Sequence, residues 1–290
     1  MVVADRTLEV RPVGVEDFDV IAPLLDLFEN KKMSRGDWRT MLFDYPWWNG
    51  EVRGYALYAA ETPVGFIGTV FSRRSVNGRD EVFCNLSSWI VRDAYRSASI
   101  LLVKAVLAIR DCTLVNLTPT ERSYDIFAKL GFRPLESEQL LLAPLASPMG
   151  FLGASYRLDL DEITRRVDAE SKRLVEGIRV CPQIKPILIE SRGRSCLMFV
   201  RAKSVRGVRI AEILSLSNPD VFWEHRALAH LAAARAIGCI GLQLDARYAG
   251  DRRPRGAFRR VLRRSFCASR HDVSAMHVDG LYTELMYLSI

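Results

Sequence analysis

The sequence lacks the features that mark membrane, secreted and disordered proteins. No apolar run in its 290 residues reaches the roughly 18 residues that a membrane span needs. The amino-terminal MVVADRTLEV has no basic segment followed by an apolar one, which is the layout of a signal peptide. Charged residues make up 26% and hydrophobic residues 49%, a balance typical of folded globular chains. These absences predict a cytoplasmic protein with no membrane contact.

Cysteine and histidine are also scarce. The six cysteines are scattered without a CxxC pair, and neither they nor the four histidines show the spacing of zinc ligands. His225 and His230 lie five residues apart, which turns their side chains to different faces of a helix. We therefore expect free thiols and no metal site.

Acidic residues are outnumbered only in the second half of the chain. Residues 1–150 hold 17 Lys and Arg against 19 Asp and Glu, whereas residues 151–290 hold 24 against 15. Seven arginines gather in the segment Arg252–Arg264. Its open interpretations are a solvated basic face, a site for a phosphate-rich substrate, a dock for an acidic acyl carrier protein, or a nucleic-acid surface. Nucleic acid is the least favoured, because no run of interleaved aromatic residues could stack on bases.

The pattern of apolar residues predicts a mixed sheet in the first half. Short apolar runs mark the strands, helical spacing marks the helices, and the dipeptide Asn77-Gly78 marks a tight hairpin. Hairpins make neighbouring strands antiparallel and helical crossovers make them parallel, so we expect an α/β fold with a mixed sheet. The expected strands are 8–12, 55–60, 64–72, 81–91, 113–118 and 135–143, and the expected helices are 15–30, 100–109 and 121–130.

One stretch, Glu81–Leu102, combines a strand, a polar turn and a helix. Its strand ends at Val91, Arg92–Arg96 form the polar turn, and Ser97 or Ser99 is suited to cap the following helix. The first N–H groups of a helix lack intrahelical partners, and the helix dipole is positive at that end. The stretch is therefore expected to bind an anion such as a phosphate group.

The element order, the segment VRDAYRSASILL and the later FAKLGF together resemble the GNAT superfamily of acyl-CoA-dependent N-acetyltransferases. In that family the strand ends in a pattern close to V-x-P-x-x-R-G-x-G-x-G/A, whose loop amides hold the coenzyme A pyrophosphate at a helix N-terminus. Ser99 and Leu101 stand where the family has glycine or alanine, and relatives that accept acyl groups from acyl carrier protein also vary this loop. The resemblance implies acetyl-CoA or another acyl-CoA as co-substrate, with acyl carrier protein as the alternative donor. The implied donor-binding residues are Ile90, Val91, Arg96, Ser97, Ala98, Ser99 and Ile100.

The resemblance also implies where a proton donor should lie. In the family a tyrosine near the end of the penultimate helix protonates the departing thiolate. The matching residue here is Phe127 in FAKLGF, which has no proton to donate. Tyr124 lies one turn upstream on the same side of the helix and is the candidate substitute.

Acyl transfer to an amine further needs a base and contacts to the pantetheine arm. Asn85 and Ser87 could hold a water that serves as the base, and Glu81 is the nearest carboxylate. Asn116, on the next strand, could contact the pantetheine. The expected function is transfer of an acetyl or other acyl group to the amine of a small molecule, such as an amino sugar or amino acid. The alternative is a catalytically inactive module that binds acyl-CoA or regulates.

The second half of the chain repeats the first in outline. SCLMFVRAKSVRGVRIAEILSLS is similar to GFIGTVFSRRSVNGRDEVFCNLSSW, with Gly207 answering Gly78, and an apolar helix and a strand follow each. Its counterpart of the phosphate loop lacks glycine and carries Asp220 and Glu224, which would repel a pyrophosphate. We therefore expect two domains, residues 1–150 binding acyl-CoA and residues 151–290 forming a degenerate GNAT-like half. The terminal LYTELMYLSI is predicted to close the second half as a strand.

Overall fold

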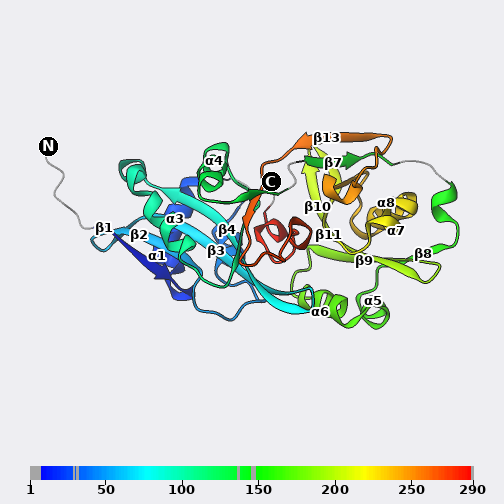
Figure 1. Cartoon of the computed structure of the whole chain (residues 1–290), viewed down its shortest axis with the longest axis horizontal. Coiled ribbons are helices and arrows are strands. Elements are labelled where there is room, and N and C mark those ends of the chain that lie inside the picture. Colours follow the sequence, from blue (N-terminus) through cyan, green and yellow to red (C-terminus); the bar gives the residue numbers. More distant parts are fainter. Residues whose placement is uncertain (1–7, 29, 31–32, 136–137, 145–147, 289–290) are drawn as a thin grey trace. The chain divides into compact units, whose positions relative to one another are not determined.

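A computed structural model describes residues 8–28, 30, 33–135, 138–144 and 148–288. The chain forms two compact units, each built on one seven-stranded sheet (Figure 1). Unit 1 comprises Met1–Arg133, Ser265–His277 and Tyr282–Leu288, and unit 2 comprises Pro134–Arg264, Val278–Leu281 and Ser289–Ile290. The predicted mixed α/β fold with two similar halves is confirmed.

The sheet of unit 1 has the predicted central strand in its middle, in the order β1-β2-β3-β4-β5-β14-β6. The pairs from β1 to β4 are antiparallel, whereas β4 and β5 are parallel. The β3–β4 hairpin turns at Asn77-Gly78, where both φ angles are positive, at 53° and 77°. An NG dipeptide favours this conformation, as the sequence predicts. The strands are β1 (Leu8–Val13), β2 (Gly54–Ala59), β3 (Thr62–Val76), β4 (Arg79–Val91), β5 (Thr113–Asn116), β6 (Arg133–Pro134) and β14 (Ser265–Cys267).

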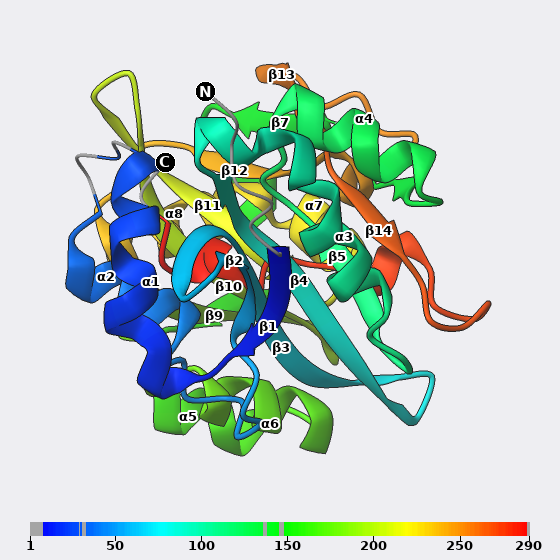
Figure 2. The ribbon, with the colours of Figure 1, turned by 90° about the vertical axis from the view of Figure 1, so that its left-hand side faces the viewer.

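Helices cover both faces of this sheet, as Figure 2 shows for strands β1 to β4. Successive side chains of a strand point to opposite faces, so Phe66 and Val70 of β3 pack with the first two helices while Ile67 and Phe71 pack with the third. The sheet is therefore buried on both sides, in keeping with its long apolar strands. The helices are α1 (Phe18–Leu25), α2 (Arg35–Leu42) and α3 (Ile100–Leu107).

The fourth helix, α4 (Glu121–Lys129), begins and ends where the sequence predicts. Thr120 is its cap, and the Thr120 side chain accepts a hydrogen bond from the N–H of Ser123. Gly131, just beyond the last turn, has φ +91°, a conformation that glycine adopts without strain. These signals fix the position of Phe127 and Tyr124 on the helix.

The sheet of unit 2 has the order β13-β7-β12-β11-β10-β9-β8. Its β10–β11 hairpin turns at Arg206-Gly207, with φ angles of 51° and 81°, which matches the turn at Asn77-Gly78. Strands β11 and β12 are parallel, as β4 and β5 are in unit 1. The strands are β7 (Glu138–Leu142), β8 (Ala154–Arg157), β9 (Ile184–Ser191), β10 (Arg194–Val205), β11 (Val208–Leu216), β12 (Leu242–Asp245) and β13 (Ala257–Val261).

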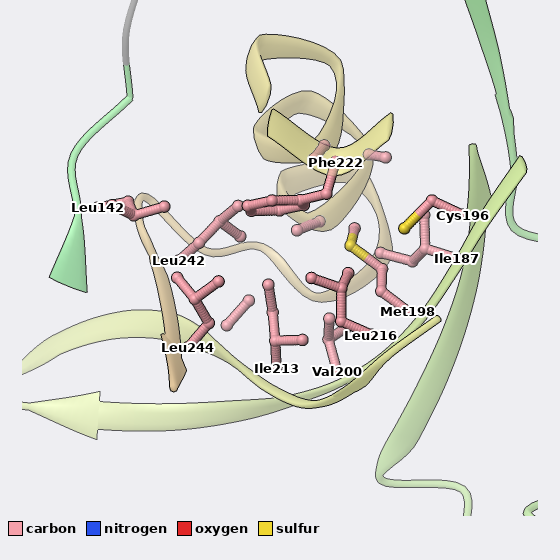
Figure 3. Close-up of a cluster of buried hydrophobic side chains, with 14 of the residues drawn as sticks. Leu142, Ile187, Cys196, Met198, Val200, Ile213, Leu216, Phe222, Leu242 and Leu244 are labelled. Carbon is pink, nitrogen blue, oxygen red and sulfur yellow. The ribbon is translucent and has the colours of Figure 1, made fainter. Parts of the chain in front are cut away.

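One face of this second sheet is apolar and packs against two helices, α7 (Pro219–Glu224) and α8 (Arg226–Ile237). Figure 3 shows Phe222 of α7 lying over apolar side chains from several strands, Val200, Ile213 and Leu242 among them. Two further helices, α5 (Leu160–Arg166) and α6 (Ala169–Gly177), lie between β8 and β9 in the chain.

Adjacent residues on β10 and β11 carry buried charges. Arg201 and Glu212 are 5% and 2% exposed, and the Arg201 Nη2 atom lies 2.6 Å from the Glu212 Oε2 atom. The Lys203 ammonium lies 3.3 Å from the other carboxylate oxygen. A buried carboxylate is thus held between two cations.

Two strands are exchanged between the halves of the sequence. β7, which the sequence places last in the first half, pairs with β12 and β13 in the sheet of unit 2. β14, near the end of the chain, pairs with β5 in the sheet of unit 1. The prediction that 135–143 belongs to the first sheet is therefore wrong; residues 136–137 lie outside the described residues. Figure 2 shows β14 alongside β5.

The terminal segment is not the predicted strand. It contains a 3₁₀ turn, Glu284–Met286, capped by the Thr283 side chain, which accepts a hydrogen bond from the Leu285 N–H. Residues Tyr282–Leu288 belong to unit 1, whereas Val278–Leu281 belong to unit 2. Short-range apolar alternation cannot reveal this, because the segment is buried by tertiary packing rather than by pairing in a sheet. The division of the sequence at residue 150 remains a proposal.

Candidate functional site

A bulge interrupts β4 near its C-terminal end. Phe66 of β3 pairs with Ile90 and Gly68 pairs with Ser87, so two residues of β4, Ser88 and Trp89, stand opposite Ile67 alone. Ser88 has φ +55°, a conformation that is uncommon for residues other than glycine. Such a bulge turns backbone groups out of the regular ladder, and bulges are frequent beside active sites.

The strand next to β4 diverges from it before the bulge. The parallel pairing of β4 with β5 covers only Phe83–Asn85 on β4, although β4 continues to Val91 against β3. Peptide groups in a strand alternate in direction, so beyond Asn85 those on the β5 side of β4 have no ladder partner from β5. The predicted contact residues Ile90 and Val91 lie on this open stretch. It is a slot in which a ligand could add to the edge of β4.

Asn85 is buried where the two strands part. Its side chain is 2% exposed, and neither its amide nitrogen nor its amide oxygen has a hydrogen-bond partner among the described residues. A buried amide without partners is costly, and such groups in a folded protein commonly point to a water or ligand site. Ser87, the next residue on the same face, has its hydroxyl 3.2 Å from that of Ser88. The structure thus brings both predicted polar residues of β4 to the bulge.

Phe127 occupies the position where the resemblance implies a proton donor. Its ring is buried and lies 5.8 Å from the ring of Trp89, the second residue of the bulge, in an edge-on arrangement. On its other side Phe132 lies 4.8 Å away. Tyr124, the predicted substitute, is half-buried one turn earlier on α4. The family position is therefore next to the bulge in space, but its side chain has no hydroxyl.

The polar turn after β4 is helical rather than an open loop. Residues Asp93–Ala98 form a 3₁₀ helix, in which N–H groups donate to carbonyls three residues back. The Tyr95 N–H donates to the Arg92 carbonyl and the Ser99 N–H to the Arg96 carbonyl, at 2.9 and 3.2 Å. These amides are already engaged. The turn contains Arg96, Ser97 and Ala98, and Ser99 and Ile100 follow at the start of α3.

Arg96, the predicted phosphate-binding arginine, lies within this turn. It is exposed and pairs with Asp93 at 2.7 Å, an interaction that water and salt weaken. Ser99 precedes α3 without a capping hydrogen bond from its side chain. The first turn of α3 therefore keeps the positive end of its dipole towards this connection.

Glu81 lies at the wrong end of β4 for a base. Seven residues separate it from Ser88, which is roughly 23 Å along an extended strand. Its carboxylate accepts hydrogen bonds from the hydroxyls of Thr113, at 2.6 Å, and Ser269, and lies 3.7 Å from Arg270. Glu81 fastens the start of β4 to β5 and to the segment after β14.

A different carboxylate, that of Glu284, lies at the end of β5. Glu284 is fully buried, and its Oε1 atom accepts a hydrogen bond of 2.8 Å from the Thr118 hydroxyl. Thr118 lies two residues beyond Asn116, the last residue of β5, and three beyond Val115, the partner of Asn85. The hydrogen bond from Thr118 therefore holds the Glu284 carboxylate just beyond the C-terminal end of β5.

Sequence reasoning missed Glu284 because it treated the terminal segment as a strand of the second half. Nothing in the neighbouring sequence indicates that this carboxylate is buried, because a glutamate between threonine and leucine is ordinary in a strand. Asn116, two residues before Thr118, lies on β5, the strand on which the sequence predicts it, and is buried there in register with Ser265 of β14.

Aromatic side chains cluster beside the terminal segment that contains Glu284. Trp47 lies 5.4 Å from Tyr282 and 5.9 Å from Tyr287, and its indole N–H donates to the Phe71 carbonyl at 3.1 Å. Tyr45 lies against Trp47 at 5.3 Å. Tyr45 and Trp47 therefore pack with the end of the chain, and both segments belong to unit 1.

Comparison with solved structures finds matches that share one fold. The chain matches a GCN5-related N-acetyltransferase from Anabaena variabilis with a TM-score of 0.61 and 12% identity, over 91% of this chain and 73% of that one. The chain has the GCN5-related N-acetyltransferase fold. A GCN5-related N-acetyltransferase from Kribbella flavida gives 0.58 at 12% identity, over 90% of this chain and 70% of that one.

A third match with this fold is the GCN5-related glucosamine N-acetyltransferase region of a fungal multi-domain β-N-acetylglucosaminidase. Its TM-score is 0.59 at 12% identity, and the match covers 91% of this chain and 38% of that one. The sequence matches no protein-family profile and no curated protein. The GCN5-related fold is therefore shown by structure alone.

The corresponding place in unit 2 is built differently. Asn218 caps α7 where β11 ends, and its side chain accepts a hydrogen bond from the Val221 N–H. The two acids that the sequence pointed to are both ion-paired, Asp220 with Arg252 at 2.5 Å and Glu224 with Arg194. Their repulsion towards an anion is therefore smaller than the sequence suggests.

Two further features of the described ranges bear on function. No group of three His, Cys, Asp or Glu side chains is placed to hold a metal ion there, and all six cysteines are free thiols. Over the same ranges, no helix combines the length and the apolar character needed to cross a membrane.

Proposed function

We propose that the protein is an N-acyltransferase whose site lies in unit 1, at the bulge of β4. The observation that carries this proposal is the bulge at Ser88 beside the gap between β4 and β5, in a chain with the GCN5-related N-acetyltransferase fold. Backbone N–H groups turned out of a ladder can polarise a thioester carbonyl, and this needs geometry rather than a particular side chain. Unit 1 holds nearly all of the proposed acyl-CoA-binding domain 1–150.

The residues at the gap fit the pantetheine arm and thioester of a donor. The open side of β4 from Leu86 to Val91 offers backbone groups to its amides, and Asn85 has both polar atoms free to bind it. The phosphate end fits less closely, because the 3₁₀ turn engages its own amides and has no glycine. Only Arg96 and the first turn of α3 would then contact the phosphate groups of the donor. The proposal therefore includes both acyl-CoA and acyl carrier protein as donors.

We assign the general base to Glu284 and the acid to Tyr124. An amine attacks only in its neutral form, so a buried carboxylate just beyond the end of β5 can take the proton from the acceptor ammonium. The new bond joins the amine nitrogen to the acyl carbon while the carbon–sulfur bond breaks. Tyr124 supplies a proton to the departing sulfur, and the proton that the nitrogen loses as it becomes an amide returns Tyr124 to its neutral form by way of water. Thr118 keeps the Glu284 carboxylate in place. The donor supplies the activated acyl group.

The acceptor is proposed to be a small amine such as an amino sugar or an amino acid. Trp47, Tyr282 and Tyr287 form a wall of aromatic rings near Glu284, and such rings suit the apolar faces of a sugar ring or a side chain. One of the matching structures is described as a glucosamine N-acetyltransferase region, which makes amino sugars the first acceptors to test.

The direct test is an assay of purified protein with acetyl-CoA and longer acyl-CoA thioesters against a panel of amino sugars and amino acids. Release of free thiol that depends on the amine, together with the mass of the acylated product, is the expected result. Thermal stabilisation by coenzyme A without any thiol release, across both acyl-CoA and acyl carrier protein donors, would overturn the catalytic proposal.

The second candidate function is a binding module without catalysis. The specific observation in its favour is Phe127, an inert side chain in the position next to Trp89 where the family has its proton donor. Coenzyme A binding without turnover, unaffected by substitution of Glu284, is the outcome that separates this candidate from the enzyme.

A further inference from the structure

Two adjoining hollows lie on the surface of unit 2, beside α7 and the segment after β12. The first, of about 590 Å³, is lined mainly by Trp223, Arg226, Arg252 and Arg253. The second, of about 510 Å³, shares Arg253 with it and extends towards Arg259 of β13. Each has a volume typical of a small-molecule site.

The charges that line the first hollow do not cancel. Its two acids, Asp220 and Glu224, are ion-paired with Arg252 and Arg194. In the second hollow, Arg259 is paired with Glu138. The hollow therefore contains more positive charge than its own acids neutralise.

Arg226 has no counter-charge. Only 9% of its surface is exposed, and among the described residues no carboxylate lies within ion-pairing distance of its guanidinium. Its hydrogen bond is to the Arg255 carbonyl at 3.3 Å, which leaves most of its five N–H groups without an acceptor among the residues that the structure describes. Burial lowers the pKa of Arg226. A half-desolvated arginine without an anion is costly, and a bound anion would relieve that cost.

Arg253 adds a second free cation. It is exposed, lines both hollows, and has no ion pair or hydrogen bond to any described residue. Two guanidinium groups, one fixed on α8 and one on the neighbouring loop, suit the several oxygens of a phosphate group, because each can donate two parallel hydrogen bonds.

Trp223 supplies an aromatic surface beside these arginines. Its indole N–H donates to the Tyr248 carbonyl at 2.7 Å, which fixes the orientation of the ring. The Arg226 guanidinium lies 5.9 Å from the ring centre on one side. The half-buried ring lines the first hollow, so a planar heterocycle could stack on it while its phosphate reaches the arginines.

We propose that the Trp223–Arg226–Arg253 hollow of unit 2 binds a nucleoside phosphate. A small ligand is favoured over an acidic protein or a nucleic acid, because only two arginines here are unpaired and they converge on a hollow of small-molecule size. The interpretation of Arg252–Arg264 as one basic face is wrong in part, since Arg264 is buried and pairs with Asp245 at 3.3 Å. The proposal does not depend on acyl transfer in unit 1.

The test is isothermal titration calorimetry of the full-length protein with ADP, inorganic phosphate and a hexose phosphate. ADP should bind more tightly than the other two probes, because it alone has both the phosphates and the aromatic ring. Arg226→Gln and Arg253→Gln should each weaken ADP binding roughly tenfold or more, since each removes a charged donor. Trp223→Leu should abolish the preference for ADP over hexose phosphate.

Arg235→Gln is the matched control, because Arg235 is exposed on the same helix and the substitution removes the same charge. It should leave ADP affinity unchanged. If Arg226→Gln lowers the melting temperature, its loss of ADP binding could come from partial unfolding. The Arg253→Gln variant then provides the test, because Arg253 is exposed and its substitution removes no buried contact. Coenzyme A, which contains the same chemistry, is titrated as well.

Three outcomes would overturn the proposal. The first is no heat of binding with millimolar ADP. The second is ADP affinity that survives Arg226→Gln and Arg253→Gln but falls with Arg96→Gln, which would put the nucleotide in unit 1. The third is binding of RNA or an acidic protein, lost in the same variants, without binding of ADP. Unchanged acyl transfer in Arg226→Gln would show that the two proposals stand or fall separately.

Discussion

At the scale of single residues, the chemistry of the site depends on a few side chains whose surroundings differ from those of their neighbours. Asn85 is buried beside the gap without a hydrogen-bond partner among the described residues. Phe127 stands next to Trp89 and lacks the hydroxyl of the tyrosine that the family has at this position. Glu284 is a buried carboxylate just beyond the end of β5. Each of these is ordinary in sequence. Its role depends on what the fold brings next to it.

Glu284→Gln should reduce kcat/KM by roughly 10²–10⁴ with little change in thermal stability, because it removes a base but keeps the shape and the acceptor oxygen for Thr118. Steady-state kinetics measure the change in kcat/KM, and thermal melting measures the change in stability. Glu51→Gln, at an exposed position, is the control. Full activity in Glu284→Gln would rule Glu284 out as the base.

Phe127→Tyr should increase kcat by roughly tenfold, because it provides a hydroxyl next to Trp89, whereas the proposed acid Tyr124 lies one turn away on α4. Burying that hydroxyl should cost about 1–3 kcal/mol of stability unless it finds a partner. In this variant, a further Tyr124→Phe change should be tolerated, whereas in the natural sequence Tyr124→Phe should slow turnover. Phe132→Tyr, in the neighbouring ring, should give no gain. An unchanged kcat in folded Phe127→Tyr would contradict the assignment.

The buried charges of unit 2 predict a stability effect in acid. Burial would raise the pKa of Glu212, but the charges of Arg201 and Lys203 outweigh it and lower this pKa from 4.5 to about 2. A lowered carboxylate pKa contributes stability that is present above about pH 4.5 and is lost as the pH falls towards 2. The contribution is on the order of 3 kcal/mol.

Denaturant unfolding at pH 7, 4 and 2.5 checks this. Glu212→Gln should be destabilised by roughly 3–5 kcal/mol at pH 7, because two buried cations lose their partner, and its stability should fall less between pH 4 and 2.5 than that of the natural protein. Glu170→Gln, exposed at the start of α6, is the control. Parallel pH dependences in both proteins would contradict the assigned pKa.

At the scale of elements, the decisive feature is a single extra residue in β4. Side chains alternate along a strand, so one inserted residue moves every later side chain to the opposite face. Trp89 and Val91 therefore pack with the third helix, while Ile90 packs with the first two. The insertion lies on the stretch of β4 beyond Asn85 that β5 no longer pairs with, where the donor is proposed to bind.

Deleting Ser88 should restore regular pairing with β3, with Trp89 opposite Ile67 and Ile90 still opposite Phe66. It should abolish acyl transfer, with a loss of at least about 100-fold, because no backbone group would then be turned out of the ladder. Ser88→Gly should retain both activity and stability, since glycine adopts a φ of +55° without strain. Acyl-transfer assays and circular dichroism on the two variants measure this. Activity in the deletion variant would show that the bulge has no part in the reaction.

At the scale of the whole molecule, the two halves of the sequence are not the two compact units. The sheet of unit 2 contains β7 from the first half, between β12 and β13, and the sheet of unit 1 contains β14 from the second, next to β5. Each sheet thus needs a strand that lies far away in the sequence.

Residues 1–150 and 151–290, expressed separately, should therefore each fail to form a stable fold, because one sheet lacks β14 and the other lacks a strand that is paired on both sides. Expressed together, the fragments should associate and recover the unfolding midpoint in part. Solubility, circular dichroism and thermal melting measure this. A cooperatively folded 151–290 fragment would contradict the expectation.

The sequence by itself determined the elements and their order. The NG hairpin and the repeat around Gly207 are local signals, because turns and apolar periodicity act over a few residues. These were enough to predict the mixed sheet, the two similar halves and the strand that has the bulge. The structure then placed Phe127, the position that the resemblance implies for the proton donor, beside that bulge.

Only the tertiary structure decided which strand joins which sheet and which carboxylate reaches the site. Glu81 and Glu284 are the same residue type, but Glu81 is bonded to Thr113 at the start of β4, while Glu284 is bonded to Thr118 just beyond the end of β5. Pairing between β5 and β14, or between β7 and β12, joins residues a hundred or more positions apart. Such contacts depend on packing over the whole chain, which no short stretch of sequence encodes.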